Sequence, residues 1–128
     1  MGGRGAFYGG TAIFKRHEFY AYARIDNIKI IKPIDESKSA KTPTLSHTPN
    51  SVYATLRRDG APKQLTVYGD NREKVYEIDL DHNHSKDPSF AIHVHYYDGK
   101  GHRLRGYHHP TREQRRLIDK FIKGVNKR

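Results

Sequence analysis

The chain has 128 residues and a formal net charge of +10, from 24 Lys/Arg and 14 Asp/Glu, and it contains no cysteine. This length suffices for one domain with a modest core, and the charge favours polyanionic partners. Without cysteine there is no disulfide framework, thiolate metal site or thiol nucleophile, so His and carboxylate side chains would have to hold any metal. No apolar run reaches transmembrane length and no signal-peptide pattern stands near the start, which predicts a cytoplasmic protein with no membrane partner.

The first part of the chain combines a glycine-rich lead, one strand and a long polar segment. Residues 1–10 contain five glycines and predict a flexible lead, followed by a single domain over residues 11–128. Ile28 and Ile30 alternate with Lys29 and predict a strand that ends at Pro33. Residues 34–51 are rich in Ser, Thr, Pro and Lys, and predict a long loop, a feature often associated with mobility or binding.

Further strands follow this loop. Apolar and polar residues alternate over residues 52–57, 65–68 and 75–80, with turn residues between the runs, and a fourth alternating run covers residues 90–97. These runs predict an antiparallel meander. Together with the earlier strand they indicate an α+β fold with a small antiparallel sheet of about four to five strands.

The last element is predicted to be a helix over residues 111–123. Thr111 and Gln114 have the spacing of a capping box, and Pro110 precedes them. The apolar residues form one stripe at helical spacing, so we expect this amphipathic helix to pack on one face of the sheet. Basic residues line its opposite side.

Positive charge is concentrated at the C-terminal end, where residues 100–128 contain ten Lys/Arg and two Asp/Glu. Such a concentration favours phosphate binding, although many basic helix faces are solvated surface without a ligand. The candidate nucleic-acid-binding residues are Arg103, Arg105, Arg112, Arg116, Lys120 and Lys123.

Four of the nine histidines fall within fourteen residues: His82, His84, His93 and His95. On a strand, His93 and His95 project from one face. If that strand pairs with residues 75–80, Asp79 and Asp81 share the same face, on the open side of the sheet away from the helix. The candidate catalytic set is therefore His93, His95, Asp79, Asp81, His82 and His84.

This set has three interpretations. In the first, one imidazole takes a proton from an RNA 2′-hydroxyl and another protonates the leaving oxygen, while Arg103, Arg105 or a cation of the last helix stabilises the phosphorane, so no cofactor is needed. In the second, a divalent metal such as zinc is bound by four imidazoles, although no recognised zinc spacing is present. In the third, the cluster is a solvated, His-rich strand face. The metal ligands of the second interpretation would be His82, His84, His93 and His95.

Several short motifs occur in order over roughly residues 25–125, at residues 27–31, 52–55, 75–82, 93–95 and 110–113, with a polar gap that contains Pro43 after the first of them. In this order they resemble the C-terminal region of phage minor head (head-morphogenesis, MuF-type) proteins. The resemblance implies a phage or prophage origin. It also implies an effector-like module similar to the barnase, EndoU, colicin and RelE ribonucleases, built as a small antiparallel sheet with helices. The 128 residues do not include the large head-morphogenesis domain, so a head-assembly role is not carried over.

Three functions follow as expectations. The leading one is a phage-derived toxin or effector that acts in the host cytoplasm as a metal-independent nuclease, on RNA in preference to DNA. The second is a non-catalytic anti-defence protein that binds nucleic acid or a host nucleoprotein complex. The third is a virion-associated structural domain with a histidine metal site.

Overall fold

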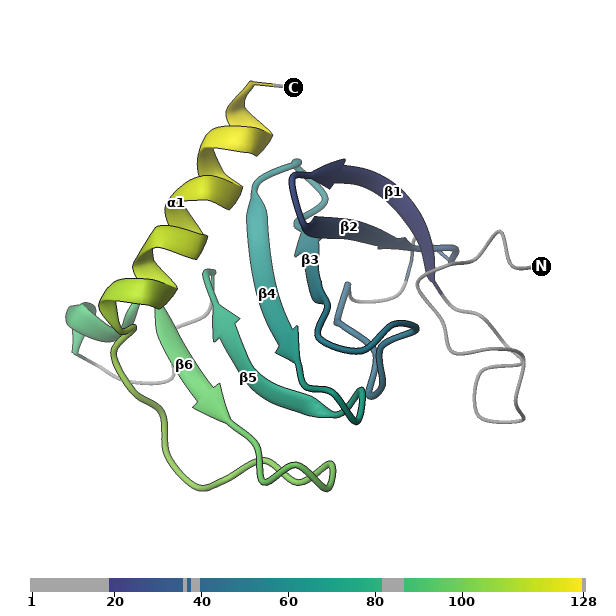
Figure 1. Cartoon of the computed structure of the whole chain (residues 1–128). Coiled ribbons are helices and arrows are strands. Elements are labelled where there is room, and N and C mark those ends of the chain that lie inside the picture. Colours follow the sequence, from purple (N-terminus) through teal and green to yellow (C-terminus); the bar gives the residue numbers. More distant parts are fainter. Residues whose placement is uncertain (1–18, 36, 38–39, 82–86, 128) are drawn as a thin grey trace.

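A six-stranded sheet and one C-terminal helix form an α+β fold in the computed structural model of the chain (Figure 1). The structure describes residues 19–35, 37, 40–81 and 87–127, so the predicted glycine-rich lead lies outside the described residues. The strands are β1 (Phe19–Ile25), β2 (Ile28–Pro33), β3 (Val52–Leu56), β4 (Pro62–Tyr68), β5 (Lys74–Asp79) and β6 (His93–Tyr96). A short 3-10 helix, η2 (Pro88–Phe90), precedes β6, and the long helix is α1 (Arg112–Asn126).

The strands lie in the sheet in chain order, from β1 at one edge to β6 at the other. All neighbours are antiparallel except β2 and β3, which run parallel. The α+β prediction is confirmed, whereas four to five strands was too few. The missed strand is β1. A register shift between Ala21 and Ala23 and exposure on both of its faces remove the alternation by which a strand is recognised.

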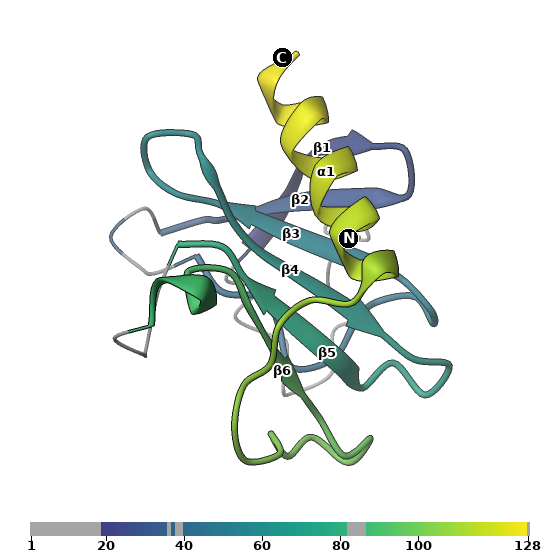
Figure 2. The same cartoon turned by 90° about the vertical axis from the view of Figure 1, so that its left-hand side faces the viewer.

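Helix α1 packs across one face of the sheet, which Figure 2 shows from the side of the helix. Thr111 caps the helix and Gln114 completes the predicted capping box, because each side chain bonds the other residue's backbone N–H. Ile118 and Phe121 are buried in the main core with apolar residues of β2 to β6. None of the described residues forms a helix that is both long and apolar enough to cross a membrane.

The opposite face of the sheet is also covered, partly by residues 40–48 of the predicted polar loop. The backbone N–H of Thr42 donates to the Gln64 side chain, the Tyr68 hydroxyl donates to the Pro43 carbonyl, and the His47 N–H donates to the Tyr53 hydroxyl. The described residues of 34–51 contain neither helix nor strand. Two of these hydrogen bonds are buried and the third is partly buried, so residues 42–47 are packed against the sheet.

Candidate functional site

The candidate site lies at the β6 edge of the sheet, on the face away from α1. Strand alternation places Ile78 and Val94 in the helix-side core. Their neighbours therefore point to the other face, where Asp79 stands opposite His93 and Glu77 opposite His95. The predicted facial arrangement of Asp79 with the two histidines is confirmed.

Asp79, His93 and His95 form a compact group. Each residue offers one ligand atom, and these three atoms all lie within 4.8 Å of one another. His93 Nε2 lies 3.7 Å from Asp79 Oδ2. The two imidazole rings are nearly perpendicular, with centroids 5.0 Å apart. One carboxylate and two imidazoles thus converge on a single small volume.

A hydrogen bond to the backbone fixes the orientation of the His93 ring. His93 Nδ1 lies 2.9 Å from the carbonyl oxygen of Phe90, which can only accept, so Nδ1 carries the proton and Nε2 faces Asp79. Phe90 ends η2, whose first turn is capped by the side chain of Asp87. The His93 ring is therefore held from the side opposite a possible ligand, as in many metal-binding histidines.

Both imidazoles are buried, which corrects the prediction of an open sheet face. His93 is 0% and His95 4% exposed. The Tyr107 ring lies over the pair, with its centroid 5.4 Å from that of His93 and 6.2 Å from that of His95. Tyr107 belongs to a segment that follows β6 in the chain. The alternation within β6 therefore could not predict that its histidines are buried.

Burial also changes the acid–base behaviour of His95. Loss of hydration lowers its pKa to about 4, and the positive charge of Arg103 and the neighbouring His93 act in the same direction. His95 is therefore neutral near pH 7. A neutral imidazole is a metal ligand or a base, but not a proton donor of the imidazolium type.

Glu77 is a central residue that sequence reasoning missed as a site residue. It is 4% exposed, and its carboxylate accepts hydrogen bonds from Lys74 Nζ at 2.8 Å, from Gln64 Nε2 at 2.8 Å and from the Tyr97 hydroxyl at 3.0 Å. Arg103 Nη2 lies 3.5 Å away. The sequence could have identified Glu77, because it stands two residues before Asp79 and residues two apart on a strand point to the same face.

A pocket borders the buried group. It has a volume of about 500 Å³ and is lined by His95, Arg103, Leu104, Arg105, Gly106 and Tyr107. Two predicted nucleic-acid-binding residues, Arg103 and Arg105, thus stand beside His95. Arg103 links the pocket to the polar face, because it contacts both Glu77 and the hydroxyl of Tyr97.

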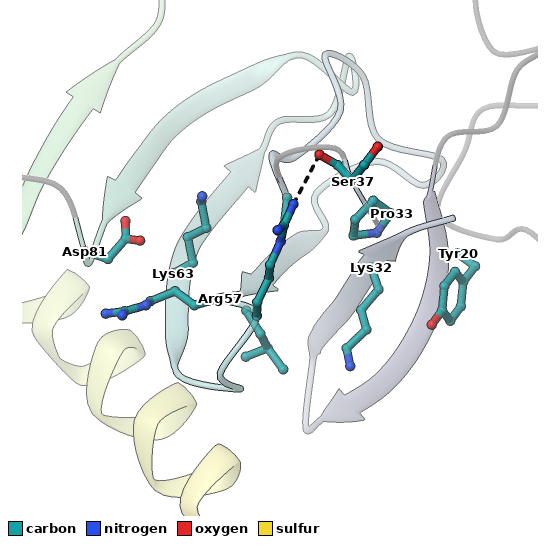
Figure 3. Close-up of a pocket in the computed structure, with 10 residues that line it drawn as sticks. Tyr20, Lys32, Pro33, Ser37, Arg57, Lys63 and Asp81 are labelled. Carbon is teal, nitrogen blue, oxygen red and sulfur yellow. Dashed lines mark hydrogen bonds between the residues drawn. The ribbon is translucent and has the colours of Figure 1, made fainter. Parts of the chain in front are cut away.

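The other predicted residues are not part of this group. Asp81 was expected beside Asp79, but it is exposed and lines a separate pocket with Lys63 (Figure 3), because the chain leaves the sheet after Asp79. His82 and His84 lie outside the described residues. The remaining predicted cations are exposed on α1, which packs on the opposite face: Arg112, Arg116, Lys120 and Lys123.

No family model matches the chain, and neither the curated proteins nor the solved structures give a significant match. We therefore interpret the site from its own geometry.

Proposed function

We propose that this protein is a metal-dependent nuclease, with a divalent ion such as zinc held by Asp79, His93 and His95. The convergence of their three ligand atoms within 4.8 Å carries the proposal. Two imidazoles and one carboxylate resemble the ligand sets of catalytic zinc sites, which leave the fourth position to water. Two ligands of a tetrahedral zinc are about 3.4 Å apart for bonds of about 2.0–2.1 Å, close to the 3.7 Å between His93 Nε2 and Asp79 Oδ2.

The state of the side chains supports metal binding. Zinc requires deprotonated nitrogen ligands, and the lowered pKa of His95 provides a neutral imidazole well below pH 7. The Phe90 carbonyl holds the His93 ring, and the Tyr107 ring packs against both histidines before any ion arrives. Little rearrangement is then needed on binding.

Nucleic acid is the substrate class that the charge favours. The chain carries a net charge of +10, and Arg103 and Arg105 line the pocket beside His95. A divalent ion held by Asp79, His93 and His95 would supply Lewis-acid chemistry for phosphodiester hydrolysis. Guanidinium groups next to the site would stabilise the charge that develops on the phosphoryl oxygens. RNA is the first substrate to test.

Metal-independent cleavage, with His93 and His95 as acid and base, fits this geometry less well. His93 is fully buried, and the low pKa of His95 leaves almost no imidazolium at neutral pH. Acid–base catalysis needs both groups within reach of the substrate, one of them protonated. Chelation distinguishes the two mechanisms, because a metal-independent enzyme keeps its activity.

The test combines metal content with cleavage. Protein freed of metal by a chelator and dialysed against zinc should retain about one zinc per chain by elemental analysis, as expected for one site. It should cleave labelled single-stranded RNA or DNA only after zinc is restored. The double variant His93→Ala, His95→Ala should lose both properties.

His102→Ala is the matched control, because His102 is an exposed histidine paired with Asp98 and lies outside the group. It should keep both zinc and cleavage. Unchanged cleavage in chelator would overturn the proposal, and so would a zinc content that the double variant does not reduce.

A further inference from the structure

A second, larger pocket lies at the end of the sheet where β2, β3 and β5 finish and β4 begins (Figure 3). Its volume is about 880 Å³. Four cationic side chains line it, from β2, from the turn after β3 and from β4: Lys32, Arg57, Arg58 and Lys63. Asp81 is the one carboxylate among its described lining residues. The pocket is therefore strongly positive.

Contacts within the wall set the positions of its cations. Arg58 Nη2 donates to the Ser37 carbonyl at 3.1 Å, which holds the guanidinium at the pocket wall. Lys32 Nζ lies 3.8 Å from the centroid of the Tyr22 ring, a cation–π contact that leaves its charge intact. Arg57 Nη2 lies 3.2 Å from Asp59 Oδ2, an ion pair that partly neutralises its charge.

This pocket and the proposed metal ligands occupy the same end of the sheet. Asp79 is the last residue of β5 and His93 the first of β6, and Asp81 of the pocket wall follows Asp79 by two residues. The Leu80 N–H donates to the Lys63 carbonyl at 2.9 Å, which ties the two regions together. Leu56 lines the pocket and also belongs to the helix-side core, so the pocket opens on the α1 side of the sheet.

We propose that this basic pocket binds the phosphate backbone of a single-stranded nucleic acid. The choice of nucleic acid as the ligand rests on the proposed function. The bound nucleic acid would run around the end of the sheet toward Asp79. Cations distributed over three chain segments suit several successive phosphates better than one. Tyr20, which is 40% exposed in the pocket wall, offers a ring on which a base can stack.

Binding can be measured without cleavage. The probe is a fluorescein-labelled uridine octanucleotide, followed by anisotropy in chelator over a series of salt concentrations. The pocket variant is Arg58→Gln, Lys63→Gln, and the control is Arg115→Gln, Lys127→Gln, two exposed cations of α1 and its C-cap. Both variants remove two positive charges, so a difference between their affinities for the octanucleotide shows where the octanucleotide binds.

We expect the pocket variant to bind at least about tenfold more weakly in 0.1 M salt, with a slope of log K against log [salt] shallower by about 1.4, since each phosphate contact contributes about 0.7. The control should change affinity less than about threefold. Unchanged melting temperatures exclude misfolding as the cause, and Arg58→Lys with Lys63→Arg should retain binding because both charges remain.

Equal losses in the pocket and α1 variants would overturn the inference, as would no loss in either. Competition by inorganic phosphate at the octanucleotide's own concentration would identify a single-phosphate site and would also overturn it. All measurements are made in chelator. Failure of zinc binding or of cleavage therefore refutes the proposed function alone and leaves this result standing.

Discussion

Glu77 and His95 face each other across β5 and β6 on the buried polar face of the sheet. Glu77 also accepts hydrogen bonds from Lys74, Gln64 and Tyr97. Removing one partner of a buried ion pair leaves the other charge uncompensated, so Glu77→Ala should lower the free energy of unfolding by about 3–5 kcal/mol. Urea titration measures this change.

The comparison for Glu77→Ala is Lys120→Ala, which breaks the exposed ion pair between Lys120 and Asp26. Exposed pairs contribute about 0–1 kcal/mol, so this variant should be nearly neutral. Similar effects in the two variants would mean that Glu77 does not act as a buried partner of Lys74.

Zinc should stabilise the folded protein through Asp79, His93 and His95. A ligand that binds only the native state adds about 2.7 kcal/mol at a free concentration one hundred times its Kd. The melting temperature of the unaltered protein should therefore rise with added zinc, whereas that of His93→Ala, His95→Ala should not. An equal rise in both would place zinc at another site.

Acid should destabilise the metal-free protein through His95. Its pKa is about 4 in the folded protein and about 6.5 for an unperturbed histidine. Between these values the unfolded chain binds more protons, so stability is complete above about pH 6.5 and falls as the pH drops toward 4. The full loss is on the order of 3 kcal/mol, at 1.36 kcal/mol per pKa unit.

His95→Gln should flatten this part of the profile. The measurement is urea unfolding in chelator at half-unit pH steps. A slope between pH 4 and 6.5 that is as steep in His95→Gln as in the unaltered protein would assign the effect to other groups.

Gly124 marks a close approach between α1 and β1. A Cβ atom at this position would lie 2.5 Å from Cγ2 and 2.6 Å from Cδ1 of Ile25. In an open helix Gly→Ala stabilises by about 1 kcal/mol, but here overpacking should reverse the sign and destabilise by about 1–3 kcal/mol.

A double-mutant cycle tests this contact. Ile25→Ala removes the obstructing atoms, so Gly124→Ala should cost less, or become stabilising, in the Ile25→Ala background. Thermal unfolding of the four proteins gives the coupling energy. The absence of coupling would show that Ile25 does not restrict position 124.

Local patterns predicted much of this fold. Alternation identified most of the strands, and the spacing of Thr111 and Gln114 identified the start of α1. The parallel pairing of β2 with β3 was missed, because the pairing of distant strands is not encoded in the alternation of either one. The start of β4 at Pro62 was also missed, since Pro62, Lys63 and Gln64 lack an apolar alternation.

The candidate site was predicted only in part, because alternation indicates which residues share a face but not which distant segments cover that face. Once β5 and β6 are paired, alternation places Asp79 and His93 on the same face of the sheet, but the register that sets them opposite each other is known only from the structure. The burial of His95 depends on residues 103–107, which follow a turn after β6, and the basic pocket joins residues from Tyr20 to Asp81. Neither can be deduced until the segments are placed in space.

The parallel β2–β3 pair restricts how the chain can be shortened. A two-residue turn can join antiparallel neighbours, but parallel neighbours need a connection of about a dozen residues or more, which returns along the sheet. Residues 34–51 make that connection, and Thr42 and Pro43 within it bond Gln64 and Tyr68. Residues 40–48 of this segment also cover the second face of the sheet. An internal deletion here would open the sheet, whereas the β3–β4 hairpin at Gly60 has the exposed tip at which loops tolerate changes in length.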